Sequence, residues 1–231
     1  IKVQKLKSDF VANVSHELRT PLQSIKLGLE TINNGHAAKD LESQKKILPV
    51  VLQQTSRMEN IVNDLLSLSR IELQEHIRPN EKVNLNDIIS HSIELHQEIL
   101  KKNNIECQFE RESKNVKING DRNRLIEVFN NLIDNGIKYS EKNKKITITT
   151  KSENKNFLVT IKDQGIGISK ENIPQVTERF FRVDPAKSKE VGGTGLGLAI
   201  VKHIVNQHRA EMTISSEINK GTEISLNFPT I

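Results

Sequence analysis

Residues 121–135 read DRNRLIEVFNNLIDN and predict a helix with one apolar side. Asn131 and Asn135 are four positions apart and therefore share the other face, with Lys138 about one turn further along. Two carboxamides and an ammonium group on one face suit a polyphosphate with bound magnesium, because amide oxygens can ligate the metal and lysine neutralises phosphate. A solvated helix in an asparagine-rich chain would give the same pattern, so this stretch alone leaves both interpretations open.

The elements around this helix alternate between strands and helices. Apolar and polar residues alternate over 146–150 and 157–161, as in strands of a sheet with one covered face. We expect helices over 87–102, 122–139 and 194–207, and strands over 105–110, 116–119, 145–151, 156–162, 211–217 and 222–228. This order predicts an α/β sandwich formed by residues 81–231.

The preceding residues, 1–80, predict a pair of long helices instead. Apolar side chains recur every three or four positions over residues 6–32 and again over residues 48–65. Asn33-Asn34-Gly35 favours a helix end between them, and Pro49 should begin or kink the second helix. A lone hairpin cannot bury both stripes, so we expect dimerisation. The predicted fold class is α + α/β: an antiparallel helical hairpin forming a dimeric four-helix bundle, followed by the α/β sandwich.

Glycine-containing turns flank the later strands and helix. Gly165 and Gly167 let a ligand ring approach the backbone, and Asp163 can accept a hydrogen bond from an adenine amino group. Residues 192–198, GGTGLGL, open the helix expected over 194–207 and free backbone N–H groups for phosphate. Lys220-Gly221-Thr222 adds a tight turn before the last strand. Taken singly, each segment is explained nearly as well by a simple turn.

The hairpin carries a histidine in an unusual setting, SHELRTPL at residues 15–22. His16 lies two positions from two members of the apolar stripe, so its side chain should point away from the packed face, as should Thr20. Pro21 has no N–H for the Glu17 carbonyl, so a kink should begin beside the histidine. An exposed histidine next to a carboxylate suits a nucleophile with a proton acceptor, and an ordinary surface histidine would look the same.

Composition narrows the classes of function. The chain has 34 Lys and Arg against 29 Asp and Glu, interspersed, and only 3% aromatic residues, which disfavours a nucleic-acid-binding surface. The single cysteine, Cys107, excludes an intramolecular disulfide or a cysteine-based zinc cluster and suits a reducing compartment. No apolar run approaches the ~18 residues of a membrane span. Because the chain starts at Ile1, we expect a fragment of a longer protein.

Taken together, five segments resemble the characteristic boxes of the sensor histidine kinases of two-component systems, in the family's order. They are the phosphoacceptor box at 10–22 (FVANVSHELRTPL), the N box at 131–140 (NLIDNGIKYS), the first glycine box at 163–168 (DQGIGI), the phenylalanine box at 178–184 (ERFFRVD) and the second glycine box at 192–201 (GGTGLGLAIV). The resemblance implies a dimerisation and histidine phosphotransfer domain over 1–80 and a catalytic domain over 81–231, with the ATP-binding fold shared with DNA gyrase and MutL.

The resemblance also implies a role for each matching residue. His16 would be the phosphorylated nucleophile and Glu17 its proton acceptor, and Thr20 would position water for dephosphorylation. Asn135 would ligate magnesium. The other residues of the ATP site would be Asn131, Lys138, Tyr139, Asp163, Gly165, Gly167, Arg182, Gly193, Gly195, Leu196, Gly197 and Thr222. Thr177 stands where the family usually has phenylalanine, which leaves open how the loop before residue 197 packs against the hairpin.

The implied activity is that of a homodimeric protein-histidine kinase using ATP and Mg²⁺. It would phosphorylate His16, pass the phosphoryl group to an aspartate on a response regulator receiver domain, and dephosphorylate that regulator. Such a chain would be the cytoplasmic portion of an inner-membrane sensor protein, with membrane contact only through segments absent from this chain and no nucleic-acid partner. The alternatives are an ATPase or serine-directed kinase on the same nucleotide fold, or a basic non-enzymatic binding module.

Overall fold

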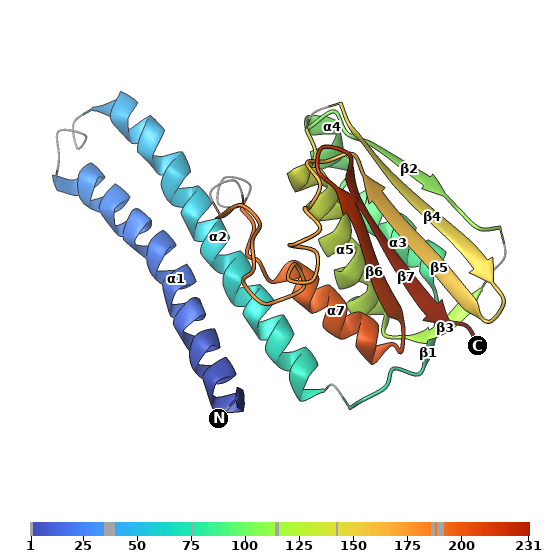
Figure 1. Cartoon of the computed structure of the whole chain (residues 1–231). Coiled ribbons are helices and arrows are strands. Elements are labelled where there is room, and N and C mark those ends of the chain that lie inside the picture. The colour runs from blue at the N-terminus through green and yellow to red at the C-terminus, as the bar shows by residue number, and fades with distance from the viewer. Residues whose placement is uncertain are drawn as a thin grey trace.

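The computed structural model describes residues 2–34, 40–74, 76–113, 116–141, 143–185, 188 and 192–231, with the backbone alone for residues 2–9 and 34. In the hairpin, α1 (Lys2–Asn34) and α2 (Leu41–Leu73) lie side by side and antiparallel (Figure 1). The Asp40 carboxylate caps α2 by accepting hydrogen bonds from the Glu42 and Ser43 N–H groups. The expectation that Pro49 begins the helix is therefore wrong, because Pro49 lies inside α2. The turn expected at Gly35 lies outside the described residues.

The apolar face of α2 differs in part from the predicted stripe. Val51, Ile61, Leu68 and Ile71 are buried, whereas Leu48 and Val62 remain 46% and 38% exposed. The helix α2 packs against two partners: α1 on one side and α7 (Gly197–Gln207) on the other. The second contact draws Leu68 and Ile71, which follow the predicted stripe, into the core of the α/β sandwich. The exposure of Leu48 and Val62 in a single chain agrees with the expectation that a lone hairpin cannot bury its whole apolar surface.

The α/β sandwich is built on a five-stranded sheet with the order β2-β4-β5-β7-β6. Its strands are β2 (Glu106–Glu110), β4 (Lys145–Glu153), β5 (Asn156–Asp163), β6 (Glu211–Glu217) and β7 (Gly221–Pro229). Only the β2–β4 pairing is parallel among the pairings within this sheet. The helices α3 (Leu85–Leu95), α5 (Arg122–Tyr139) and α7 cover the face of the sheet nearer to the hairpin (Figure 1), which confirms the predicted fold class of the chain.

Three local differences separate the observed sandwich from the predicted one, the first being that α7 begins at Gly197 and not at residue 194. The helix expected over 87–102 is divided at His96 into α3 and α4 (Gln97–Lys102). A short strand that was not expected, β1 (Glu81–Asn84), pairs antiparallel with β3 (Lys117–Gly120), and the Asn84 side chain then caps α3. With Asn84 as its cap, α3 begins at Leu85, two residues before the predicted start. Beyond these points, the predicted bounds of α5 and β6 agree with the structure.

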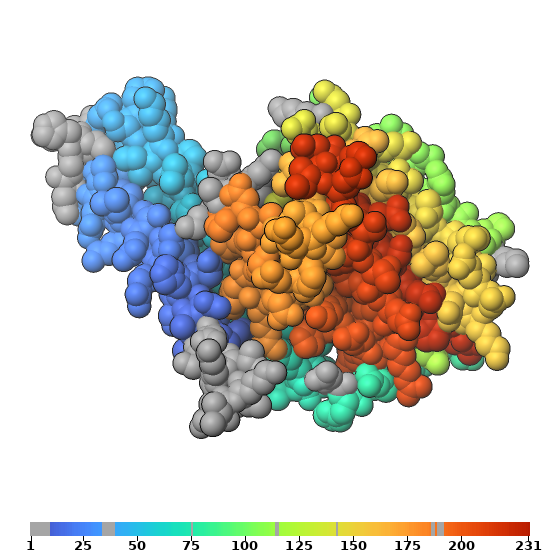
Figure 2. Space-filling model, viewed as in Figure 1, coloured from blue at the N-terminus to red at the C-terminus, as the bar shows by residue number. Residues whose placement is uncertain are grey.

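The hairpin and the sandwich meet through polar contacts as well as a shared apolar core. Gln207 at the end of α7 donates to the carbonyl oxygens of Gln74 and Ile77 at 3.0 and 3.1 Å, and Arg179 pairs with Glu72 on α2. The space-filling view shows the orange segment before α7 lying against the blue hairpin (Figure 2). Within the described ranges, every helix is too short or too polar to cross a membrane.

Candidate nucleotide and phosphotransfer site

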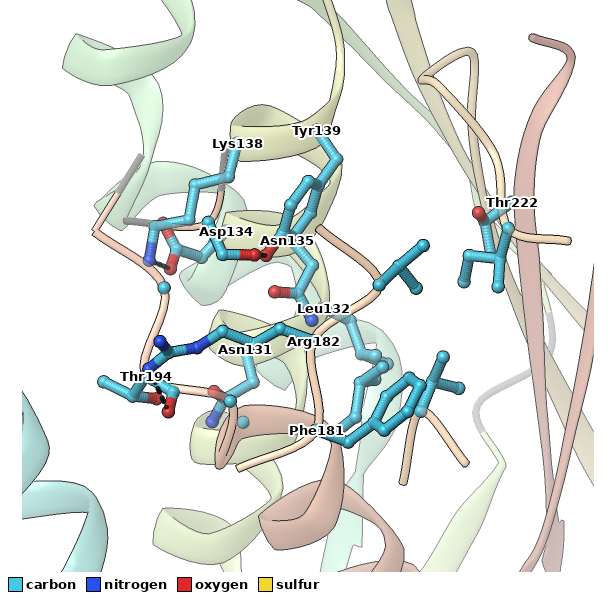
Figure 3. A pocket seen from close by; sticks show the side chains of 18 of the residues that line it. Asn131, Leu132, Asp134, Asn135, Lys138, Tyr139, Phe181, Arg182, Thr194 and Thr222 are labelled. Atoms are coloured by element: carbon cyan, nitrogen blue, oxygen red, sulfur yellow. Dashed lines mark hydrogen bonds and ion pairs between the residues drawn. The ribbon is translucent and has the colours of Figure 1, made fainter. Parts of the chain in front are cut away.

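A cavity of about 320 Å³ opens between α5, the ends of β5 and β7, α2 and the loop that precedes α7 (Figure 3). We call residues 164–196 the lid loop. The cavity brings together most of the residues predicted for an ATP site: Asn131, Asn135, Lys138, Tyr139, Asp163, Gly167, Arg182, Gly193, Gly195, Gly197 and Thr222. Residues from the N box, both glycine boxes and the phenylalanine box therefore line one cavity, although they span residues 131–198 of the sequence.

The helix α5 aims its polar face into this cavity. The Asp121 carboxylate caps α5 by accepting hydrogen bonds from the N–H groups of Asn123 and Arg124 at 2.9 and 3.1 Å. Asn131 donates from Nδ2 to the Glu127 carbonyl at 2.9 Å, which directs its amide oxygen toward the start of α7. A Cβ atom at position 197 would lie 2.6 Å from that oxygen, so only glycine lets α7 begin so close to α5.

Asp163 closes the end of the cavity at the sheet. Its Oδ1 accepts hydrogen bonds from the backbone N–H groups of Gly165 at 2.8 Å and Thr222 at 3.0 Å. Burial raises the pKa of the Asp163 carboxyl, against the lowering effect of these two hydrogen bonds. Gly165 does not line the cavity itself, so its part is to hold the Asp163 carboxylate in place. In the part of the chain that the structure describes, the second oxygen of that carboxylate accepts no hydrogen bond.

Cationic groups gather at the opposite end of the cavity. Lys138 pairs with Asp134 one turn earlier on α5, and the Arg182 guanidinium lies beside Thr194 (Figure 3). Arg182 donates to the Thr194 carbonyl at 2.9 Å. The Tyr139 hydroxyl lies 3.1 Å from the Ser188 hydroxyl, which ties α5 to the lid loop. The cavity thus has the Asp163 carboxylate at one end and, at the other, two cations that are each paired with a carboxylate, Lys138 with Asp134 and Arg182 with Glu17. Phosphate groups could replace these carboxylates as partners of the two cations.

Leu196 was expected in the ATP site, and the structure corrects that expectation. Its side chain is fully buried in the apolar core and does not line the cavity. The correction has a simple cause: Leu196 directly precedes α7, and its apolar side chain packs inward while the backbone of the neighbouring glycines faces the cavity.

The cavity also has a wall that the sequence did not predict, formed by Asn60, Asn63 and Asp64 of α2. The Thr194 hydroxyl donates a hydrogen bond of 2.6 Å to the Asp64 carboxylate. Burial raises the pKa of the Asp64 carboxyl, while that hydrogen bond and the charge of Lys138 act in the opposite direction. The only sequence signal for this wall is the presence of polar residues on a predicted amphipathic helix. That signal does not show that these residues face the cavity.

The phosphoacceptor box lies on α1, outside the cavity. His16 is exposed, as predicted, whereas Thr20 is half-buried and its hydroxyl donates to the His16 carbonyl at 3.3 Å. Glu17 is held by two arginines. Arg182 of the lid loop reaches its two carboxylate oxygens at 2.8 and 3.3 Å, and Arg57 of α2 approaches one of them at 3.3 Å. An ion pair therefore joins the residue next to His16 to the wall of the cavity.

The lid loop also packs against α1 through aromatic contacts. The rings of Phe180 and Phe10 lie 6.0 Å apart between centroids, and the Arg179 guanidinium lies over the Phe10 ring. Thr177, which replaces the usual phenylalanine, accepts a hydrogen bond from Lys202 of α7 at 3.1 Å instead. The loop therefore keeps an aromatic contact with the hairpin despite Thr177.

Two family models match this chain. The model "His Kinase A (phospho-acceptor) domain" matches residues 6–74, and the model "Histidine kinase-, DNA gyrase B-, and HSP90-like ATPase" matches residues 120–231. Together they cover most of the chain. The first covers the hairpin with His16, and the second covers α5, the lid loop, α7 and the sheet strands that line the cavity.

Two bacterial sensor proteins are similar in sequence to this chain. The chain is 35% identical to the phosphate regulon sensor protein PhoR of Pseudomonas aeruginosa over 98% of its own length and 51% of that protein. It is 36% identical to the sensor protein kinase WalK of Staphylococcus aureus, over 99% of its own length and 55% of that protein. The chain thus spans about half the length of these relatives.

Solved structures show the same arrangement of elements. The Acinetobacter baumannii histidine kinase AdeS is 26% identical and superposes with a TM-score of 0.72, covering 93% of this chain and 97% of that one. The histidine kinase ThkA, solved in complex with the response regulator protein TrrA, is 25% identical with a TM-score of 0.80, covering 100% of this chain and 64% of that one. The phosphoacceptor hairpin, the ATPase-type sandwich and the similarity to these proteins lead to one conclusion: the chain belongs to the sensor histidine kinases.

Proposed function

We propose that this chain phosphorylates His16 with ATP and passes the phosphoryl group to an aspartate of a response regulator receiver domain. The observation that carries the proposal is the ion pair between Glu17 and Arg182, because it joins the residue beside an exposed histidine to the wall of a nucleotide-sized cavity. In the proposed division, residues 1–80 supply the phosphoacceptor and residues 81–231 supply the ATP site.

ATP would lie with its base at the sheet and its phosphates toward α2. The free oxygen of Asp163 would accept a hydrogen bond from the adenine amino group, since Oδ1 already accepts two backbone N–H groups. Lys138 and Arg182 would contact the phosphates, and the backbone N–H groups at the start of α7 would add to their positive potential. Tyr139 and the glycines of the lid loop would shape the walls.

The cavity also suits a magnesium ion bound together with ATP. Mg²⁺ is commonly held by one or two protein oxygens, with the remaining positions filled by phosphate oxygens and water. The amide groups of Asn131 and Asn135 offer such oxygens, and no cluster of three or more acidic, histidine or cysteine side chains competes for a metal within the described ranges. Asn135 is the proposed ligand, with Asn131 beside it. When bound, the ion would neutralise charge on the phosphates that face the nucleophile.

The proposed reaction is an in-line phosphoryl transfer. A ring nitrogen of His16 forms a bond to the γ-phosphorus while the bond from that phosphorus to the β–γ bridging oxygen breaks, and ADP leaves with the electron pair of that bond. The imidazole gives up a proton, for which Glu17 is the nearest carboxylate in sequence. Transfer to the receiver aspartate then restores neutral His16. In the separate dephosphorylation reaction, Thr20 would hold the water that hydrolyses the aspartyl phosphate of the regulator.

The partner and the assembly follow from the hairpin. Exposed apolar side chains on it, Leu22, Leu29, Leu48 and Val62, would be covered by the hairpin of a second copy. A receiver domain would dock where His16 is exposed, and the ThkA–TrrA complex supports this choice of partner. Because ATP and receiver domains are cytoplasmic, we place this chain on the cytoplasmic side of an inner-membrane sensor.

Labelling with ATP carrying a marked γ-phosphate, in the presence of Mg²⁺, tests the proposal directly. We expect label on His16 that is labile in acid and stable in base, and its loss in His16→Ala. Base-labile or acid-stable label would identify a serine-directed kinase instead. Release of inorganic phosphate without labelled protein would identify an ATPase. Either result would replace the proposed function.

A further inference from the structure

Arg57 on α2 is a buried cation with an unusual environment. Only 6% of its side chain is exposed, and its single polar contact among the described residues is to Glu17 at 3.3 Å. Arg182 is equally buried, at 6%, and approaches the same carboxylate from the lid loop. The three side chains meet where α1, α2 and the lid loop converge.

This cluster holds more positive charge than its carboxylate can neutralise. Two guanidinium groups face one Glu17 carboxylate, and the Nε–H groups of both arginines are buried without a partner within the described parts of the chain. Burial, and next the neighbouring charge of Arg182, lower the pKa of Arg57, while Glu17 acts in the opposite direction. Removal of one arginine would leave a balanced pair, which a buried site tolerates far better than a surplus charge.

The positions of the two arginines decide which of them can move away from the Glu17 carboxylate. Arg182 belongs to the lid loop and lines the nucleotide cavity, so nucleotide phosphates compete with Glu17 for its guanidinium. Arg57 does not line the cavity, and it shares the hairpin with Glu17. Packing of α1 on α2 therefore keeps Arg57 beside Glu17 wherever the lid loop lies.

We propose that Arg57 is a positioning residue for phosphoryl transfer, holding the Glu17 carboxylate beside His16 when ATP draws Arg182 away. The inference rests on the proposed function. Arg57 acts through Glu17 and does not touch the nucleotide. Arg182 instead exchanges the Glu17 carboxylate for the phosphates of ATP. The lid loop therefore releases Glu17 when ATP binds.

Steady-state labelling of His16 at varied ATP concentration tests the role of Arg57. Arg57→Met should lower kcat about tenfold or more and leave KM for ATP within about twofold, because it misplaces the acceptor and not the nucleotide. Arg57→Met should still fold, since Glu17 and Arg182 then form a balanced pair, and a melting curve checks this. Arg57→Lys should restore most of kcat. Arg70→Gln, which removes an exposed arginine of the same helix, should match the wild type.

A second comparison isolates the route through Glu17. In a Glu17→Gln background, measured by single-turnover labelling, Arg57→Met should cause no further loss. An equal loss in both backgrounds, or a raised KM with unchanged kcat, would overturn the positioning role. Failure of Arg57→Lys to recover activity despite a normal melting curve would also overturn it. Wild-type protein that binds ATP and never labels His16 would instead refute the proposed function, so the two failures are distinct.

Discussion

The imidazole of His208 accepts a hydrogen bond of 2.9 Å at Nε2 from the backbone N–H of Asp121, and so joins the end of α7 to the start of α5. Its Nδ1 lies 2.8 Å from the Ile204 carbonyl oxygen and donates to it, so the ring is neutral with the proton on Nδ1. Burial lowers the pKa of His208, against the raising effects of that carbonyl and of the Asp121 charge. The two helices that frame the cavity thus depend on one uncharged ring.

The free energy of unfolding should fall in mild acid because of His208. A lowered folded-state pKa means that the unfolded chain binds a proton more readily, so the contribution is complete above the unfolded value of about 6.5 and is lost as pH falls below it. Urea unfolding at a series of pH values should show this decline. His208→Gln should flatten it, and His76→Gln, which changes an exposed histidine, should retain it. Parallel curves for wild type and His208→Gln would contradict the assignment.

Asp163→Asn should weaken ATP binding by at least about tenfold. An asparagine that keeps its oxygen toward the N–H groups of Gly165 and Thr222 would turn its NH₂ group toward the adenine amino group, so that two donors face each other. An unmet hydrogen bond to a charged acceptor costs about 1.5–3 kcal/mol. Isothermal titration with ATP measures the change. Unaltered affinity would mean that Asp163 only stabilises the turn.

Asn135→Ala should abolish most labelling of His16 while the protein remains folded and dimeric. The substitution removes an amide oxygen that we assign to magnesium, whereas Asn135→Asp keeps an oxygen ligand and should retain part of the activity. Titration of Mg²⁺ at fixed ATP should show no higher requirement for the ion in Asn135→Asp than in the wild type, because a carboxylate attracts Mg²⁺ at least as strongly as an amide oxygen. Normal labelling of Asn135→Ala would remove Asn135 from the metal site.

Thr20→Ala should retain His16 labelling and lose most of the dephosphorylation of the regulator. Thr20 is half-buried and lies one turn beyond the exposed His16, where its hydroxyl can hold water near a docked aspartyl phosphate. Attack of histidine on ATP needs no such water. Paired rates with the purified cognate regulator measure both activities. Equal loss of the two would indicate a structural role for Thr20, and intact dephosphorylation would assign the water to another group.

Val62→Glu should dissociate the dimer at tens of micromolar protein. Val62 is 38% exposed on α2, and a second hairpin would bury it, so a carboxylate there would be desolvated without a partner. Sedimentation velocity distinguishes monomer from dimer. Lys46→Glu, which reverses a charge at another exposed position of α2, is the control and should stay dimeric. A wild-type monomer with an intact hairpin would refute the dimer.

The sequence predicted local structure better than relationships between distant segments. Apolar periodicity over residues 121–139 defined α5 closely, because this signal acts within a few residues. The packing of α2 against α7 was not predicted, because it joins two segments that are far apart in the sequence. Asp64 and Arg57 were missed for the same reason: their roles arise from contacts with the lid loop and α1, which are set by tertiary packing and leave no periodic trace.

The wall that α2 contributes to the cavity has a thermodynamic consequence. Asn60, Asn63 and Asp64 lie on the helix that also packs against α1. If a displacement of the hairpin changes the affinity for ATP by some factor, then bound ATP changes the equilibrium constant of that displacement by the same factor. Reciprocity of this kind makes nucleotide concentration a second input to the hairpin, beside any signal that reaches it from upstream. The concentration of ATP and any signal that displaces the hairpin would then both act on the position of α2.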